Sequence, residues 1–227
     1  MSEDRPGRPV DELATTRHSY DAGELTETSL AGHWLEQLQR WYDEAAARND
    51  IPEPNAMQIA TVDEQGRPDL RTVLARGFDD RGVVFYTNYN SAKGGQLART
   101  PLAAGLFAWL PLARQVRFRG PVERVSEAES AAYFASRPRG AQLAAWASPQ
   151  SEVIAGRDQL DELLDGIIRR FGEDAETGAP VPVPPFWGGY RITVTEMEFW
   201  QGREFRLHDR LRFRQDGADW VVERLAP

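Results

Sequence analysis

The sequence has no cysteine, only three histidines and no long apolar run. The absence of cysteine excludes disulfides, iron–sulfur clusters and thiolate zinc sites, and it is typical of a reducing compartment. His18, His33 and His208 lie far apart in the sequence, so we expect no metal site. A transmembrane helix needs about 18 successive apolar residues, and the polar start lacks the core of a signal peptide. We therefore expect a cytoplasmic protein with no membrane partner.

The excess of acidic residues limits the class of ligand. The 35 aspartates and glutamates outnumber the 27 lysines and arginines, which gives a formal net charge of -8. A field of this sign repels polyanions. A nucleic-acid-binding barrel fits the local basic segments but not the acidic total, so we expect no nucleic-acid partner. Any anion site must be a local cluster of cations.

The pattern along the chain indicates one β-rich domain. Residues 1–28 are polar, which predicts a flexible N-terminal arm before a single domain at 29–227. Apolar residues at helical spacing predict helices over 31–49 and 157–171, and Ser126 with Glu129 forms a capping box for another. The remaining segments alternate and carry turn signals, as strands do. The predicted fold class is α+β but mainly β, an antiparallel barrel with peripheral helices.

The segment REFRLHDRLRFR (203–214) concentrates cations in this acidic chain. Read as a strand, it has apolar residues on one face, and on the other it has Arg206, His208, Arg210, Arg212 and Arg214. An ordinary solvated strand edge explains this pattern about as well as a binding site does. The alternative is an anion site, because a guanidinium fork fits phosphate or carboxylate oxygens and a histidine titrates near neutral pH.

Three further segments carry cations. In YTNYNSAKGG (86–95), Ser91 can cap a short helix, and Lys93 can join the N–H groups of that helix in a phosphate cradle. RTVLAR (71–76) has an arginine at each end, and SRPRG (136–140) adds two more. Each segment alone is explained more simply by a capped helix or by solvated charges. Together, the four clusters suggest one or two ligands with phosphate groups.

Several segments, taken in order, resemble one known enzyme family. The pyridoxine/pyridoxamine 5′-phosphate oxidases, which use FMN, have segments similar to RTVLAR, FYTNYNSAKG, RQVRFRGPVERV, YFASRPRGAQLAAWASPQS, PPFWGGYRI and EFWQGREFRLHDRLRF with WVVERLAP. The similarity runs from about residue 55 to the C-terminus, and the final block is its most specific part. The resemblance implies a split β-barrel homodimer with FMN at the subunit interface.

The resemblance also implies a set of flavin contacts. Arg71 and Lys93 would bind the FMN phosphate, and Gln115 would meet the isoalloxazine ring. Several of the others would come from the partner chain, namely Gln150, Ser151, Trp200 and Arg210. The complete implied set is Arg71, Thr72, Val73, Leu74, Tyr86, Thr87, Lys93, Gln115, Gln150, Ser151, Trp200 and Arg210.

The implied substrates are pyridoxine 5′-phosphate and pyridoxamine 5′-phosphate. Arg206 and His208 would be the catalytic residues, in contact with the pyridine ring and its substituents. Arg17 and Tyr20 lie in an arm segment that would close over the site. The complete implied set of substrate contacts is Arg17, Tyr20, Arg76, Tyr133, Arg137, Arg206, Leu207 and His208.

The implied reaction is FMN-dependent oxidation to pyridoxal 5′-phosphate, with dioxygen as acceptor and hydrogen peroxide released, in vitamin B6 biosynthesis or salvage. Two alternatives stay open: a split-barrel flavin oxidoreductase with another substrate, and a non-catalytic protein that binds FMN or pyridoxal phosphate. The sequence departs from the family pattern at Arg76, where a lysine is usual. Ala92 and Ala141 replace an arginine and a serine that are common in the family, so two phosphate contacts would be missing.

Overall fold

The structure, a computed structural model, describes Tyr20, residues 23–174 and residues 179–227. The α-helices in these ranges are α2 (Trp34–Ala46), α3 (Ala92–Arg99), α4 (Glu127–Ser136), α5 (Arg139–Ala147) and α6 (Arg157–Phe171). The strands are β1 (Ala56–Val62), β2 (Pro68–Asp79), β3 (Gly82–Asn88), β4 (Leu102–Trp109), β5 (Arg114–Arg124), β6 (Trp187–Ile192), β7 (Glu196–Gln201), β8 (Asp209–Asp216) and β9 (Asp219–Arg224). Two short 3-10 turns are η1 (Leu110–Leu112) and η2 (Glu204–Arg206). Most of the predicted arm lies outside the described residues, so its flexibility stays a prediction.

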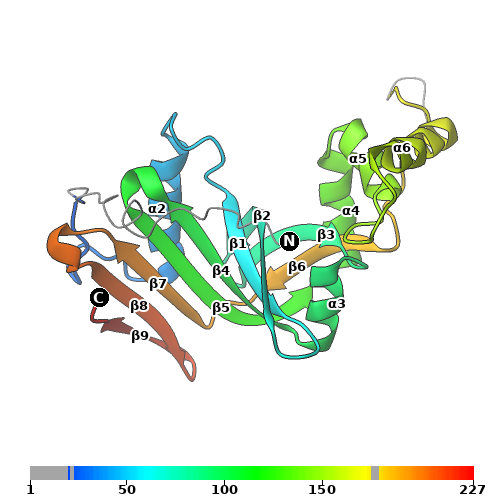
Figure 1. Ribbon diagram of the computed structural model, residues 1–227. Coiled ribbons are helices and arrows are strands. Elements are labelled where there is room, and N and C mark those ends of the chain that lie inside the picture. The colour runs from blue at the N-terminus through cyan, green and yellow to red at the C-terminus, as the bar shows by residue number, and fades with distance from the viewer. Residues whose placement is uncertain (1–19, 21–22, 175–178) are drawn as a thin grey trace, which may run out of the picture.

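Six strands close into an antiparallel barrel. Their order is β4–β1–β2–β3–β6–β5, and β5 also pairs with β4, which closes the circle. From β5 the sheet continues through β7 and β8 to β9. Figure 1 shows this extension at one end of the molecule and helices α4, α5 and α6 at the other. The prediction of a mainly β barrel with peripheral helices is confirmed.

Alternation along the strands sorts residues between the barrel core and the outer face. On β5, Val116 and Phe118 are fully buried, whereas Arg117 and Arg119 are exposed. Met57 and Ile59 of β1 are fully buried in the same core. Burial of each large apolar side chain stabilises the fold by about 1.5–3 kcal/mol. The outer face of β5 is therefore available for polar residues, as the sequence predicts.

The first helix is shorter than the predicted segment but has the predicted character. α2 packs on the sheet through Trp41, whose ring meets that of Phe199 edge-on at a centroid distance of 5.3 Å. The side chain of His33 caps the helix by accepting a hydrogen bond from the backbone N–H of Leu35. His33 directly precedes the first residue of α2, where an N-cap residue lies, although histidine is not among the preferred N-cap residues.

A buried arginine anchors α4 to the barrel. Arg191 of β6, 3% exposed, donates from Nη1 to Asp79 at 2.7 Å and from Nη2 to Glu129 at 3.0 Å. Glu129 also completes the predicted capping box with Ser126. The start of α4 is thus held by both its own cap and a strand of the barrel, and the residues along α4 are placed relative to β2 and β3.

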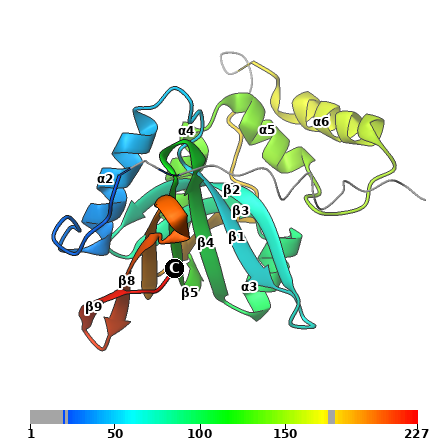
Figure 2. The same cartoon turned by 60° about the vertical axis from the view of Figure 1, so that its left-hand side comes forward.

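Helices α5 and α6 project from the barrel (Figures 1 and 2). The helix predicted over 157–171 is confirmed, but Phe171 is its only buried residue, so the apolar stripe is only partly covered within one chain. Arg139 at the start of α5 donates to the carbonyl oxygens of Gly172 and Ala179, both at 2.9 Å, and so joins the two helices through the end of α6. Among the described residues, no helix has the length and apolar character needed to cross a bilayer.

Candidate functional site

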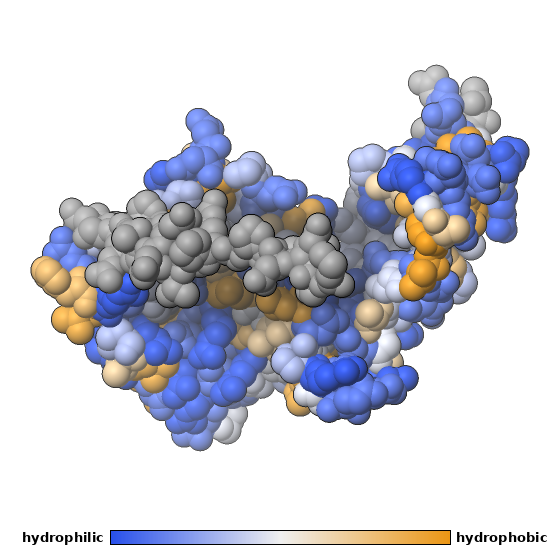
Figure 3. Space-filling view, viewed as in Figure 1, coloured by the Kyte–Doolittle hydropathy of each residue, from blue (hydrophilic) through white to orange (hydrophobic). Residues whose placement is uncertain are grey.

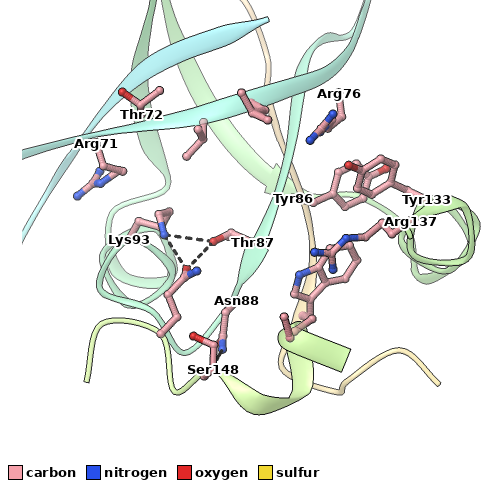
Figure 4. A pocket seen from close by; sticks show the side chains of 16 residues that line it. Arg71, Thr72, Arg76, Tyr86, Thr87, Asn88, Lys93, Tyr133, Arg137 and Ser148 are labelled. Carbon is pink, nitrogen blue, oxygen red and sulfur yellow. Dashed lines mark hydrogen bonds between the residues drawn. The ribbon is translucent and has the colours of Figure 1, made fainter. Parts of the chain in front are cut away.

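A cavity of about 450 Å³ brings together cations from separate segments of the sequence. Figure 4 shows Arg71 and Lys93 on one side of it and Arg76 and Arg137 on the other. The strands β2 and β3 and the helices α3 and α4 supply these walls. The remaining lining residues are Thr72, Val73, Leu74, Tyr86, Thr87, Asn88, Tyr133, Ala144, Ala145, Ser148, Gln150 and Trp187.

Lys93 is a buried cation whose hydrogen-bond partners among the described residues are all neutral. Ser91 caps α3, as predicted, and Lys93 follows in its first turn. The Lys93 ammonium donates to Gln150 Oε1 at 2.8 Å, Thr87 Oγ1 at 3.2 Å and Ser91 Oγ at 3.3 Å. Burial, with a contribution from the charge of Arg71, lowers the pKa of Lys93 to about 8. A bound anion would relieve this cost.

Arg71 is held beside Lys93 by a polar network. Its guanidinium donates to Thr61 Oγ1 at 2.6 Å and to Gln96 Oε1 at 3.1 Å, and it forms an ion pair with Asp69. Gln96 in turn donates to Asp69 at 2.9 Å. Because these groups fix the guanidinium before any ligand binds, little ordering is needed on binding.

Arg76 and Arg137 form a second cationic group. Arg137 follows the last turn of α4, and its guanidinium lies 4.9 Å from the ring centre of Trp187. Its Nη1 is buried and has no hydrogen-bond partner among the described residues. Burial, with repulsion from Arg76, lowers the pKa of Arg137. Arg76 lies over the ring of Tyr133 at 5.8 Å. A buried guanidinium nitrogen without a partner is costly, and an anionic ligand would satisfy it.

Stacked aromatic rings form the wall between these groups and the next cavity. Tyr86 stacks on Tyr133 at a centroid distance of 4.0 Å and on Trp187 at 5.5 Å. Trp187 also lines a second cavity of about 610 Å³, together with Tyr89 and Pro184. Trp187 therefore contributes to the walls of both cavities.

Three of the predicted flavin contacts lie in one row on the outer face of the sheet. In the strand register, Gln115 of β5 is opposite Trp200 of β7, and Trp200 is opposite Arg210 of β8. None of the three lines the cavity of the same chain. Apart from Ser151, the structure therefore gathers the predicted flavin contacts into two groups, the cavity and this row.

Tyr20, Trp200 and His208 form an aromatic cluster at the end of this row. Trp200 lies 4.6 Å from His208 between ring centres, and Tyr20 lies 5.9 Å from Trp200 and 5.8 Å from His208. His208 Nδ1 accepts the backbone N–H of Arg203 at 3.0 Å, which puts the proton of the neutral ring on Nε2. Burial, with a contribution from the charge of Arg206, lowers the pKa of His208.

The prediction of a continuous strand over 203–214 is wrong in its first half. The chain forms the turn η2 there, and β8 begins only at Asp209. Phe205 and Arg206 have φ angles of 55° and 63°, the left-handed region that costs non-glycine residues about 1–3 kcal/mol. Phe205 is 89% exposed and Leu207 69% exposed, so neither packs in the core. Figure 3 shows apolar surface at the left-hand tip, where η2 lies in Figure 1.

Arg212 and Arg214, which an ordinary solvated strand edge would leave in water, are instead paired with carboxylates. Arg212 Nη2 pairs with Glu223 of β9 at 2.5 Å, and its Nη1 pairs with Glu196 of β7 at 3.3 Å. Arg214 pairs with Glu223 at 3.3 Å. Both arginines therefore belong to a ladder of ion pairs on the outer face. The sequence did not show their partners, because the carboxylates lie on neighbouring strands.

Other predicted residues have mixed outcomes. Gln150, expected from the partner chain, already contacts Lys93 within one chain, so that expectation is revised; Ser151 does not line the cavity. Leu207 lies on the exposed turn, and Arg17 lies outside the described residues. Sequence reasoning assigned no role to five lining residues, although each of them lies in a segment that resembles the family. These residues are Asn88, Ala144, Ala145, Ser148 and Trp187.

Comparison with known proteins identifies two matching regions. Residues 43–164 match the family model described as pyridoxamine 5′-phosphate oxidase. Residues 187–227 match the model described as pyridoxine 5′-phosphate oxidase C-terminal dimerisation region. Together these regions contain the cavity, the outer-face row and η2.

Individual relatives match over nearly the whole chain. The pyridoxine/pyridoxamine 5′-phosphate oxidase of Saccharopolyspora erythraea is 58% identical over 96% of this chain and 97% of its own length. That of Cupriavidus necator is 52% identical over 95% of this chain and 99% of its own length.

Solved structures share the fold. PhzG from Burkholderia lata, solved with tetrahydrophenazine-1-carboxylic acid, superposes with a TM-score of 0.80 at 32% identity and covers 92% of this chain and 100% of its own. An FMN-binding protein from Nostoc punctiforme related to pyridoxamine 5′-phosphate oxidase has a TM-score of 0.66 at 20% identity over 88% of this chain and 99% of its own, a likeness of fold alone. With both family models and these relatives in agreement, the chain belongs to the pyridoxine/pyridoxamine 5′-phosphate oxidase family.

Proposed function

We propose that this chain binds FMN and oxidises pyridoxine 5′-phosphate and pyridoxamine 5′-phosphate to pyridoxal 5′-phosphate. The observation that carries the proposal is the division of one cavity into two cationic groups, Arg71 with Lys93 and Arg76 with Arg137. A reaction between a phosphorylated flavin and a phosphorylated vitamer needs two phosphate sites close to one another. The names of the relatives support the same substrates.

The residues present fit the phosphate of FMN at the first group. Lys93 has only neutral hydrogen-bond partners among the described residues, and its burial lowers its pKa to about 8 although Asp69 opposes the shift. Arg71 is fixed next to it by Thr61 and Gln96. A phosphate bound here would receive charge-assisted hydrogen bonds from both cations.

The second group fits the phosphate of the substrate. Arg137 has a buried Nη1 without a partner among the described residues, and Arg76 is exposed toward the same cavity. Tyr133 stacks on Tyr86 between the two groups, and its ring supplies a flat surface for a pyridine ring. The pair of Arg76 and Arg137 in this cavity favours a phosphorylated substrate for this chain.

A homodimer supplies the missing contacts in this proposal. The matched dimerisation region contains Trp200 and Arg210, which do not line the cavity of their own chain. Thr72, which lines the cavity, lies opposite Gln58 of β1 in the strand register. Gln58 lies opposite Leu106 of β4, and Leu106 lies opposite Arg117 of β5. One outer face therefore extends from the cavity to the row of Gln115, Trp200 and Arg210. Two copies packed by this face would set the row of one against the cavity of the other.

The oxidation removes two electrons and two protons from the C4′ alcohol, and with the amine the resulting imine is hydrolysed to the aldehyde and ammonia. FMN, when bound, supplies the electron acceptor, and dioxygen takes up both electrons and protons as hydrogen peroxide. Arg206, on its strained turn, would hold the substrate in place, and placement alone lowers a barrier by several kcal/mol. His208 Nδ1 is engaged by Arg203, so His208 would donate from Nε2 to a substituent of the substrate.

The test compares wild type with Arg137→Met. Purified wild type should bind FMN, turn yellow and release hydrogen peroxide with both phosphorylated vitamers. In Arg137→Met, the KM for pyridoxine 5′-phosphate should rise roughly 10- to 100-fold, because a charge-assisted hydrogen bond of about 1.5–3 kcal/mol is lost. FMN affinity and the low turnover of unphosphorylated pyridoxine should stay unchanged.

Three results would contradict the proposal. A wild-type protein that takes up no added FMN lacks the cofactor. A protein that binds FMN and the vitamers but releases no peroxide is a non-catalytic binder. An unchanged KM in Arg137→Met places the substrate phosphate elsewhere.

A further inference from the structure

The outer face of β5, β7 and β8 carries a ladder in which glutamates of the middle strand bridge arginines of its neighbours. Glu198 pairs with Arg117 at 2.5 Å and with Arg210 at 2.7 Å. Glu196 pairs with Arg119 at 2.7 Å and with Arg212 at 3.3 Å. Both glutamate side chains are 7% exposed. Glu196 also lies 3.5 Å from Arg117, so the two glutamates share strand, face and burial, and each bridges an arginine of β5 to an arginine of β8.

Glu196 and Glu198 differ in the surroundings of their arginine partners on β8. Arg212 is shared between Glu196 and Glu223. Arg210 has Glu198 as its one carboxylate partner among the described residues, and its other hydrogen bond goes from Nη1 to the carbonyl oxygen of Ala226 at 2.8 Å. Arg210 also belongs to the row of Gln115, Trp200 and Arg210, in which it lies opposite Trp200.

The contact of Glu198 with Arg210 constrains one edge of the guanidinium. Glu198 Oε1 accepts from Nε, and Ala226 accepts from Nη1, so Nη2 has no hydrogen bond within the described residues and is available to a ligand. Burial raises the pKa of Glu198, but hydrogen bonds from Arg210 and Arg117 outweigh burial and hold the pKa below its ordinary value. Glu198 is therefore ionised at neutral pH, as this contact requires.

We propose that Glu198 is a positioning residue of the flavin site, which fixes Arg210 so that its free Nη2 is directed toward the flavin beside Trp200. This inference rests on the proposed function, because it takes Arg210 as a flavin contact. Glu198 itself does not touch the ligand. Its effect passes through one guanidinium, and the preorganisation of that guanidinium strengthens its interaction with negative charge on a reduced flavin.

The experiment is a comparison of Glu198→Gln with Glu196→Gln as the matched control. Both substitutions keep the side-chain shape and remove one carboxylate of the ladder. Glu198→Gln should weaken FMN binding by roughly 5- to 20-fold, since a charge-assisted contact is replaced by a neutral one. It should also shift the flavin midpoint potential to a more negative value and change the flavin absorbance band. Glu196→Gln should leave the FMN Kd, the potential and the spectrum at wild-type values.

A double-mutant cycle separates positioning from a general loss of structure. If Glu198 acts through Arg210, then adding Glu198→Gln to an Arg210→Met protein should cause no further loss of FMN affinity. Additive losses would overturn the proposal, as would equal effects of Glu198→Gln and Glu196→Gln. If Glu198→Gln does not fold, Glu198→Met takes its place in the same cycle. A wild-type protein that binds no FMN would instead refute the proposed function, so the two failures are distinguishable.

Discussion

The cavity and the ladder use the same kinds of cation in opposite ways. In the ladder, arginines on β5 and β8 meet glutamates on β7 and β9, and the positive charge is compensated within the fold. In the cavity, Lys93 has only neutral partners and Arg137 has a buried nitrogen with no partner among the described residues. Arg71 is intermediate, because it pairs with Asp69 but still faces the cavity.

The difference indicates which cations have a ligand to bind. A paired arginine stabilises the position of strands, whereas a buried cation without a carboxylate costs free energy until an anion binds. The density of arginine in the sequence does not separate the two cases. The location of the carboxylates does, and this location depends on which strands are neighbours.

Removal of a cavity cation should give the largest effect on ligand binding. Lys93→Met should raise the Kd for FMN roughly 10- to 100-fold, because one charge-assisted contact to phosphate is lost. The free energy of unfolding without FMN should not fall, since a buried charge with neutral partners is removed. Calorimetric titration and urea unfolding measure the two quantities. An unchanged Kd would mean that Lys93 does not face the phosphate.

Removal of a ladder carboxylate should lower the stability of the fold and leave FMN binding unchanged. Glu196→Ala leaves Arg119 without its ladder partner and Arg212 with Glu223 alone, and we expect a loss of about 1–2 kcal/mol in the free energy of unfolding. The affinity for FMN should stay within experimental error. The comparison would fail if this variant lost FMN binding while keeping its stability.

The titration of Lys93 should give the smallest effect, visible only at alkaline pH. The pKa of Lys93 is lowered to about 8, so in the free protein its charge is present below that pH and is lost as the pH rises through it. FMN binding then requires proton uptake, and affinity should fall above pH 8 with a limiting slope of about one logarithmic unit per pH unit. The same lowered pKa means that the cost of burying this charge is complete below about pH 8 and disappears toward the ordinary lysine pKa. Fluorescence titrations between about pH 7 and 9.5 measure the slope, and it should be absent in Lys93→Met.

The sequence predicted several starts and turns of the fold from local signals. Ser91 and the capping box of Ser126 with Glu129 depend on residues three positions apart, and both are present as predicted. The hairpin turn at Asp216-Gly217 is likewise local, with Gly217 at a φ of 64° between β8 and β9. Such signals need no knowledge of distant partners.

The predictions that the structure overturns concern mainly residues 203–214. Alternation in 203–214 favours a strand, but alternation carries no information about a backbone that turns at positive φ, as it does at Phe205 and Arg206. Arg212 pairs with Glu223, and Arg210 pairs with Glu198, across neighbouring strands. These pairs depend on the register of the strands, which cannot be read from the sequence. The segment proposed to contact the substrate is thus the one where local pattern and tertiary structure disagree, as is common where backbone strain accompanies function.

The shared position of Trp187 has a consequence for how the enzyme could change over evolutionary time. The indole of Trp187 lines two hollows of about 450 and 610 Å³. A smaller side chain at this position would enlarge both hollows and leave the pairing of the barrel strands unchanged. One residue, the first of β6, therefore influences the room for ligands on both of its sides.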